Sequence, residues 1–240
     1  MNWQNVATIA RKDLTIMMAR RGLRIGIAAL PAGLAILFSQ IIAHGNIPAS
    51  ALPQTLNAFL FFFMIYTGAL PANIAAYSMV GEKVERSLEP LLATPASDSE
   101  ILLGKALAAL LPPLTTMWAG MILLMGLCDA FTHATLGYLY FPNWLAVVTV
   151  FCVAPLLALA AVASSVLWST RVTEVRTAQQ LGALAAIPGI VIYVCLLSGV
   201  FSLNLAALAV ICAALAVLDA ALGYAARAVF HREDILTRWA

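Results

Sequence analysis

The sequence predicts an all-α integral membrane protein with six transmembrane helices, an N-terminal interfacial amphipathic helix and a short amphipathic helix in its longest loop. Three observations lead to this prediction. Hydrophobic residues make up 63% of the chain and charged residues 10%, whereas a soluble domain is about a quarter charged. Six long stretches carry almost no charge, and every Lys and Arg lies on one side of the topology that those stretches define.

The charged and sulfur-containing residues exclude several classes of protein. The formal net charge is +2 and the 13 Lys and Arg form no long basic run, so nucleic acid is not an expected partner. The four cysteines, Cys128, Cys152, Cys195 and Cys212, have no short spacing among them. A disulfide or metal framework needs clustered Cys or His, so we expect packed free thiols and no metal site.

Residues 1–24 are expected to form an amphipathic helix that lies along the membrane surface. The segment lacks the uninterrupted apolar stretch and cleavage site of a signal sequence. Arg20, Arg21 and Arg24 cluster where the chain would enter the bilayer. The apolar side chains that recur at helical spacing are Trp3, Val6, Ala10, Leu14 and Met17, with Arg11, Lys12 and Asp13 between them.

Six apolar stretches are long enough to cross the ~30 Å hydrocarbon core at ~1.5 Å per helical residue. Together they define a transmembrane domain over 25–225, followed by a cytoplasmic tail over 226–240. The fifth and sixth are separated by a short turn around Ser202, so the alternative there is a re-entrant or broken helix with Pro188-Gly189 as its break. The predicted spans are 25–43, 56–80, 103–128, 144–167, 181–201 and 204–225.

The distribution of basic residues predicts the orientation in the membrane. Of the 13 Lys and Arg, five precede the first span, three lie between or just inside the second and third, two lie between the fourth and fifth, and three follow the sixth. Segments 44–55 and 129–143 contain none. By the positive-inside rule, we expect a multi-pass protein of the cell membrane with both termini in the cytoplasm.

The longest cytoplasmic loop, 81–105, reads GEKVERSLEPLLATPASDSEILLGK. Its first half fits a short amphipathic helix. Glu82 and Arg86 are four residues apart with the acid first, an order that stabilises a helix. The apolar face of this helix is formed by Val84, Leu88, Leu91 and Leu92.

The second half of the loop contains a helix stop and a helix start. The Thr94-Pro95 step breaks the first helix, and Ser97 and Glu100 have capping-box spacing at the start of the next one. A short amphipathic helix, a turn and a capped helix fit either an ordinary surface loop or a docking site for a partner.

The loop resembles the cytoplasmic loop of type-2 ABC transporter permeases, the membrane subunits of ABC exporters. Val84, Ser87 and Asp98 depart mildly from the family pattern. Two further segments are similar to the family: 10–14, which reads ARKDL, and 228–236, which reads AVFHREDIL. Because the six-span pattern also fits the family, the resemblance covers the whole chain. The loop is the part of it that is specific to the family. The matching loop residues are Gly81, Glu82, Lys83, Glu85, Arg86, Leu88, Glu89, Pro90, Leu91, Leu92, Ala93, Thr94, Pro95, Ser97, Glu100, Ile101, Leu102, Leu103, Gly104 and Lys105.

This resemblance implies a function and a set of partners. It implies the permease subunit of an ATP-driven ABC exporter, in which the loop is a coupling helix seated in a groove of a separate ATPase subunit. ATP and Mg would be bound by that partner, because this chain lacks a Gly-x-x-x-x-Gly-Lys-Ser/Thr loop. Permeases of this family work in pairs, so a homodimer or paired permeases are implied. The docking candidates are Glu82, Glu85, Arg86, Leu88, Glu89, Leu91 and Leu92.

Several polar side chains inside the predicted spans are candidates for a substrate path. Asp219 is the clearest case, because an ionisable residue inside a membrane is expensive and often functional. An acid near the inner interface, reached by water or paired with another helix, is the alternative for Asp219. Hydrogen bonding between helices explains the uncharged candidates equally well. These are Ser39, Gln40, Asn57, Tyr66, Asn73 and Tyr77.

Three classes of function differ in the patterns that they require. An intramembrane enzyme needs a nucleophile and base or metal ligands within the spans, yet His44, His133 and His231 lie outside them; we expect no catalytic residue. The membrane component of an energy-coupled importer or a small secondary transporter is the alternative to the exporter permease. A secondary transporter more often has internal repeats or paired intramembrane charges. The identity of the substrate does not follow from the sequence.

Overall fold

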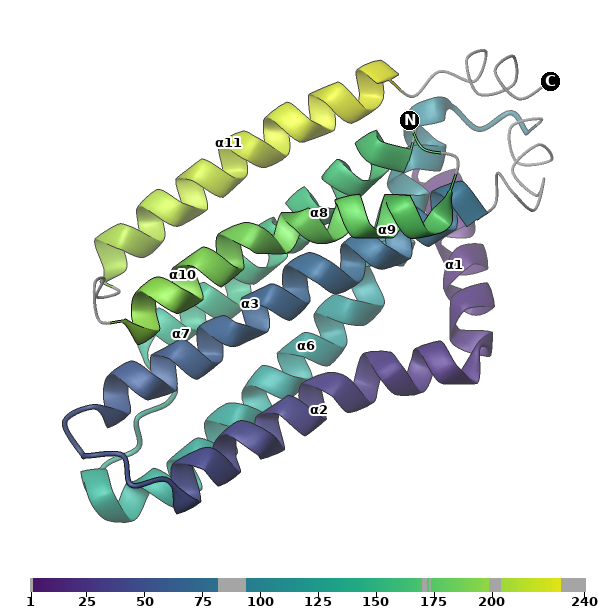
Figure 1. Ribbon diagram of the computed structural model, residues 1–240. Coiled ribbons are helices and arrows are strands. Elements are labelled where there is room, and N and C mark those ends of the chain that lie inside the picture. The colour runs from purple at the N-terminus through teal and green to yellow at the C-terminus, as the bar shows by residue number, and fades with distance from the viewer. Residues whose placement is uncertain (1, 82–93, 170–171, 173, 199–203, 230–240) are drawn as a thin grey trace.

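The computed structural model describes residues 2–81, 94–169, 172, 174–198 and 204–229 of the chain. All regular secondary structure in these residues is helical (Figure 1). The elements are α1 (Trp3–Ala19), α2 (Arg21–His44), α3 (Leu52–Ala76), the π-helical η1 (Tyr77–Gly81), α6 (Asp98–Leu136), α7 (Trp144–Val148), the π-helical η2 (Thr149–Val153), α8 (Ala154–Ser169), α9 (Val175–Ala183), the 3₁₀ turn η3 (Leu184–Ala186), α10 (Ile187–Leu197) and α11 (Leu205–Val229).

The prediction of six spans is confirmed, because the described residues contain six helical segments that are long and apolar enough to cross a membrane. The helices extend beyond several predicted spans. The largest difference is α6, which has 39 residues where the third span was predicted as 103–128. At ~1.5 Å per residue this helix is nearly twice as long as the ~30 Å core. Its ends therefore reach beyond the hydrocarbon layer.

The start of α6 follows the predicted capping box. The Ser97 side chain accepts a hydrogen bond from the Glu100 backbone N–H at 3.4 Å, and the Glu100 carboxylate accepts one from the Ser97 N–H at 3.1 Å. These two bonds satisfy backbone donors that the first helical turn leaves unpaired. The helix ends at Gly137, whose φ of 76° is a left-handed conformation that glycine adopts without strain.

The spanning segments run alternately up and down the bundle (Figure 1). The segment from α9 through η3 to α10 runs along the bundle in one direction, and α11 returns in the other. The helix is irregular at η3, which ends two residues before Pro188, close to the break that the alternative places at Pro188-Gly189. Within residues 174–198 the irregularity is a local 3₁₀ turn within one traverse of the bundle.

Helix α1 crosses the end of the bundle at a steep angle to the spanning helices (Figure 1). The chain turns at Arg20, whose φ of −78° and ψ of 102° are extended and not helical. The amphipathic helix is therefore shorter than 1–24, and Arg21 and Arg24 belong to α2. Its buried face also differs from the predicted stripe: Trp3 is 65% exposed, whereas Ile9 and Asp13 are buried.

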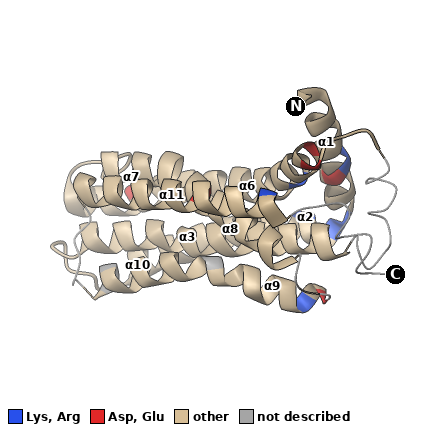
Figure 2. Ribbon diagram, turned by 90° about the horizontal axis from the view of Figure 1, so that it is seen from above, with Lys and Arg blue, Asp and Glu red and all other residues tan. Residues whose placement is uncertain are grey.

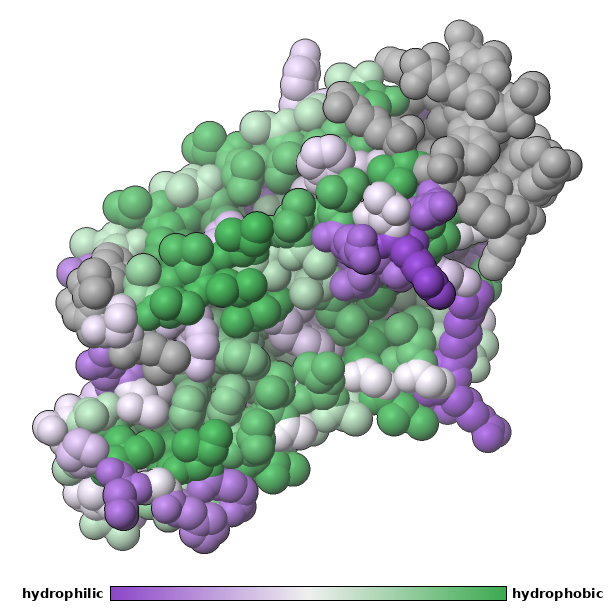
Figure 3. Space-filling model, in the orientation of Figure 1, coloured by the Kyte–Doolittle hydropathy of each residue, from purple (hydrophilic) through white to green (hydrophobic). Residues whose placement is uncertain are grey.

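Charge and apolar surface separate clearly along the bundle. Lys and Arg gather at the end where α1 lies (Figure 2), and a broad apolar surface lies between two more polar ends (Figure 3). Among the spans, α3 together with η1 is the most buried and α11 the least. This distribution is that of a bundle whose solvent along its sides is lipid.

Candidate functional site

The predicted coupling loop, 81–105, includes the last residue of η1 and the first eight residues of α6. Its seven docking candidates, Glu82 to Leu92, lie outside the described residues. The structure does describe both flanks, which are η1 up to Gly81 and the capped turn at 94–97 that leads into α6. A force applied to the loop must pass through these two flanks.

A buried ion pair joins the flanks to α1. Lys105 Nζ lies 3.2 Å from Asp13 Oδ2, and these side chains are 2% and 4% exposed. Lys105 also donates to the Ser78 hydroxyl at 3.3 Å and to the Ser78 carbonyl at 3.4 Å. The Ser78 hydroxyl in turn donates to Asp13 Oδ2 at 3.3 Å. We call Asp13, Ser78 and Lys105 the polar cluster.

The polar cluster connects three elements that are distant in sequence. Asp13 is on α1, Ser78 is on η1 before the docking candidates, and Lys105 is near the start of α6 at the end of the predicted loop. Charges buried together in a medium of low dielectric constant hold one another strongly, and either one alone is costly. The cluster therefore favours joint movement of α1 and the two flanks.

A second polar contact fixes the beginning of α1 to the beginning of α6. The Glu100 carboxylate, on a residue that is 5% exposed, accepts hydrogen bonds from the Asn2 backbone N–H and from the Asn5 side chain, the latter at 3.0 Å. The same carboxylate completes the capping box with Ser97. Glu100 thus caps the beginning of α6 and also binds the beginning of α1.

Close packing between α1 and α6 depends on Gly104. A Cβ added to this residue would lie 2.8 Å from the Cβ of Ile9 and 3.1 Å from the backbone oxygen of Val6. These distances are shorter than ordinary van der Waals contacts. A glycine at this position lets α1 and α6 approach closely. It lies on α6 between Glu100 and Lys105, the two residues that bind α1 through polar contacts.

The seven predicted path residues are spread along the bundle. Asn73 and Tyr77 line a cavity of about 400 Å³ among α1, α2, α3 and α9. Tyr66 is buried and donates a hydrogen bond to the Ile27 carbonyl of α2 at 2.9 Å. Ser39 is also buried and donates to the Ile36 carbonyl in its own helix at 2.8 Å. The Tyr66 bond joins two helices and is one expected of helix packing, whereas the Ser39 bond stays within α2.

The other three path candidates have different environments. Gln40 is exposed on α2, and Asn57 is partly buried near the beginning of α3. Asp219 is partly buried on α11, and neither of its carboxylate oxygens has a hydrogen-bond partner among the described residues. Asn73 and Tyr77 are thus the two candidates that the structure brings together, and a path through all seven stays a prediction.

Asp13, Ser78 and Lys105 could not be recognised as a unit from the sequence pattern. One signal was available, because Asp13 follows Val6 and Ala10 at helical spacing and precedes Met17 by one turn. An acid on the buried stripe of an amphipathic helix needs a partner. The identity of that partner, 92 positions along the chain, does not follow from the spacing.

A bundle of six apolar helices, each long enough to cross a membrane, has the architecture of a multi-pass membrane protein. The sequence profile described as "ABC-2 family transporter protein" matches residues 8–208. The chain therefore belongs to the ABC-2 transporter family, and the resemblance inferred from the loop is confirmed. It is a membrane component of an ABC transporter, a class that implies an ABC ATPase partner. A comparison with curated proteins gave no match.

Proposed function

We propose that this chain is the permease subunit of an ATP-driven exporter and that it moves substrate by alternating access. The observation that carries the proposal is the polar cluster, which connects both flanks of the predicted coupling segment to α1. In this account ATP and Mg are bound by the separate ATPase subunit. The permease contributes no catalytic residue to ATP hydrolysis.

The geometry supports a specific route for the movement. A partner that pushes on 82–93 acts on η1, and hence on α3, and on the start of α6. The Asp13–Lys105 pair makes α1 follow α6. Because α1 continues into α2 after the turn at Arg20, α2 follows as well. Three spans then tilt together in response to one loop.

The proposed orientation places both termini in the cytoplasm of a cell-membrane protein. It is supported by the gathering of Lys and Arg at one end of the bundle (Figure 2) and by the positive-inside rule. The ATPase would bind at that end. We propose that the permease works as a homodimer or as a pair of different permeases. Each permease would bind one ATPase at that end, and closure of the two ATPases around ATP would drive alternating access.

The proposal predicts that Glu89→Lys weakens the complex with the ATPase. Glu89 is a docking candidate of the predicted coupling helix, and reversing its charge should lower partner affinity about tenfold or more, since unfavourable charge contacts at an interface are costly. The measurement is co-purification of the natural ATPase with the permease in lipid nanodiscs, followed by ATP hydrolysis.

Glu174→Lys is the matched control. Glu174 is exposed immediately before α9, so this variant makes the same change of charge outside the loop and should leave the complex intact. An unaltered complex and unaltered ATP hydrolysis in Glu89→Lys would contradict the coupling assignment. An importer component or a secondary transporter would then be the better interpretation.

A further inference from the structure

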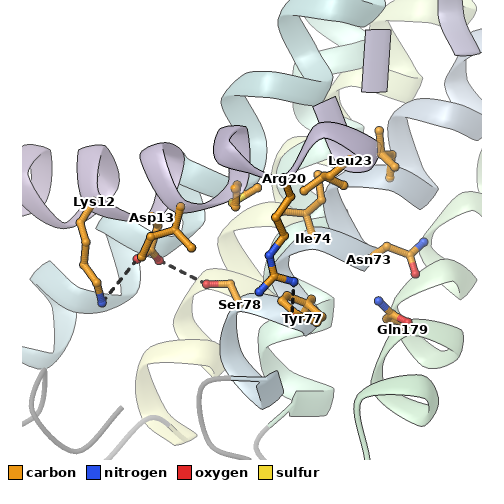
Figure 4. A pocket seen from close by; sticks show the side chains of 12 residues that line it. Lys12, Asp13, Arg20, Leu23, Asn73, Ile74, Tyr77, Ser78 and Gln179 are labelled. Carbon is orange, nitrogen blue, oxygen red and sulfur yellow. Dashed lines mark hydrogen bonds and ion pairs between the residues drawn. The ribbon is translucent and has the colours of Figure 1, made fainter. Parts of the chain in front are cut away.

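The cavity beside the polar cluster and a cavity at the other end of the bundle differ in how their charged groups are compensated. In the first, the Arg20 guanidinium lies 4.8 Å from the centre of the Tyr77 ring and donates a hydrogen bond to its hydroxyl, and Lys12 lies 3.9 Å from Asp13 (Figure 4). The charged side chains there have partners within the chain. They therefore give no reason to expect a charged ligand.

The second cavity has a volume of about 390 Å³ and lies between the second half of α6 and the segment that runs from Phe141 through α7 into η2. This is the end of the bundle opposite α1 (Figure 1). Asp129 of α6 lines the cavity, and the rest of its wall is mostly apolar and includes Phe141 and Phe151. Its volume is within the range of pockets that bind small molecules.

Asp129 is a buried carboxylate without a cation beside it. It is 8% exposed, and no Lys, Arg or His in the described part of the chain forms an ion pair with it, including His133 one turn further along α6. The connections from α2 to α3, from α6 to α7 and from α10 to α11 contain no Lys or Arg, and these residues gather at the opposite end (Figure 2). A buried charge is costly without an opposite charge, so a cationic ligand would be stabilised here.

Backbone N–H groups order the Asp129 carboxylate but leave part of its hydrogen-bonding capacity unused. Oδ1 accepts bonds from the Tyr140 N–H at 3.0 Å and from the Phe141 N–H at 3.1 Å. Oδ2 accepts at 3.1 Å from the same Phe141 N–H and has no other donor among the described residues. A carboxylate accepts about four hydrogen bonds. These peptide groups are neutral, so they hold the carboxylate in place without cancelling its charge.

Two aromatic residues make the cavity suited to an organic cation. Phe141 is 3% exposed and Phe151 is 60% exposed, and both line the cavity. The Phe151 ring lies 6.0 Å from the Trp118 ring, and the Phe141 ring lies 5.0 Å from the Tyr140 ring. Aromatic rings attract ammonium groups, quaternary ones in particular, and the apolar wall would bind the hydrocarbon part of such a molecule.

We infer that this cavity binds a small hydrophobic organic cation, with its ammonium group near Asp129 and its apolar part against Phe141 and Phe151. A phospholipid with an ammonium headgroup fits less well, because its phosphate would find no Lys or Arg in the connections at this end. The cavity contains none of the predicted path residues, and the inference does not require that the cation be transported. Only the assignment of this end to the outer side of the membrane rests on the proposed function.

The test is isothermal titration calorimetry of the full chain in maltoside micelles with benzyltrimethylammonium. We expect one saturable site for this cation. Neopentylbenzene, in which a carbon atom replaces the charged nitrogen, should bind at least about tenfold more weakly, because it keeps the shape and loses the attraction to the carboxylate and to the aromatic rings. Benzylsulfonate, which carries the opposite charge, should show no saturable binding.

Two variants locate the site. Asp129→Asn keeps a side-chain oxygen for the Tyr140 and Phe141 N–H groups and removes the charge, so it should weaken binding about tenfold or more. Its control is Glu174→Gln, which removes an exposed carboxylate that does not line the cavity. Phe151→Leu should weaken binding about two- to fivefold, whereas Phe131→Leu, an exposed position on α6 outside the cavity, should have no effect.

The comparison of the cation with neopentylbenzene uses the wild-type chain, so it holds even where Asp129→Asn folds poorly. Equal affinity for the two compounds would overturn the inference, as would unchanged binding in Asp129→Asn with an unchanged thermal unfolding temperature. Displacement of the cation by equimolar phosphatidylethanolamine would indicate a lipid site, and displacement by millimolar calcium would indicate an inorganic cation site; either result would overturn the inference. None of these measurements involves the ATPase, so failure here is distinguishable from failure of the proposed function.

Discussion

Lys105→Met is expected to lower the free energy of unfolding by about 3–5 kcal/mol, because it leaves the Asp13 carboxylate buried without its cation. Asp13 is 4% exposed and its Oδ2 is 3.2 Å from Lys105 Nζ, so water cannot readily replace the lost partner. The change is measured by reversible unfolding in mixed detergent micelles. Asp13→Leu should cost a similar amount for the same reason.

The double variant Asp13→Leu with Lys105→Met should recover most of this stability. Replacing both members of a buried ion pair by apolar side chains is often neutral or stabilising, so the two single losses should largely cancel and the double-mutant cycle should give a coupling energy of about 4 kcal/mol or more. Lys12→Met is the matched control: Lys12 is 44% exposed and 3.9 Å from the other Asp13 oxygen, and such a pair contributes at most about 1 kcal/mol. Additive losses in the double variant would mean that the pair is not coupled.

Gly120→Ala is expected to destabilise the bundle by about 3 kcal/mol. A Cβ at this position would lie 2.5 Å from the Pro31 Cβ and 3.0 Å from a ring carbon of Phe63, and a proline ring cannot turn aside. The substitution must push α2 away from α6, at the upper end of the usual cost of overpacking. The measurement is the same unfolding assay.

Gly33→Ala on α2 is the control for this contact. Nothing lies within 4 Å of a Cβ added there, so the variant should be neutral or gain up to about 1 kcal/mol from helix propensity. Equal stability of the Gly120 and Gly33 variants would show that α2 and α6 do not pack as closely as the structure places them.

The number of spans could be predicted from the sequence, whereas the full lengths of the helices could not. Hydropathy detects the part of a helix that lies in lipid, and α6 continues beyond it at both ends. The start of α6 was nevertheless predicted, because the capping box of Ser97 and Glu100 is a local pattern. Local chemistry thus located one helix start that hydropathy alone misses.

The buried face of α1 was only partly predicted, for a physical reason. At a membrane, lipid and protein interior are both apolar, so a hydrophobic stripe does not reveal which side faces the protein. Trp3 belongs to the stripe and yet is exposed, whereas Ile9 is buried against Gly104. Asp13 was the more informative residue, because a buried acid requires a protein partner.

The candidate site also has a part that could be predicted from the sequence and a part that could not. The loop 81–105 was identified from its sequence pattern, whereas the polar cluster depends on contacts between residues far apart in the chain. The cavity at Arg20 and Tyr77 likewise results from the turn between α1 and α2. A local sequence pattern locates a single segment, and the tertiary structure is needed to show which segments contact one another.

The most direct test of the account is permease-dependent ATP hydrolysis by the reconstituted complex carrying Lys105→Met, at a temperature where the variant remains folded. If the polar cluster transmits movement from the loop to α1 and α2, the ATPase will still bind, because the loop is intact. Permease-dependent hydrolysis should nevertheless fall about tenfold, a loss of about 1.4 kcal/mol in coupling, and should recover substantially in the Asp13→Leu, Lys105→Met double variant. Hydrolysis equal to that of the wild type in folded Lys105→Met would contradict the central claim.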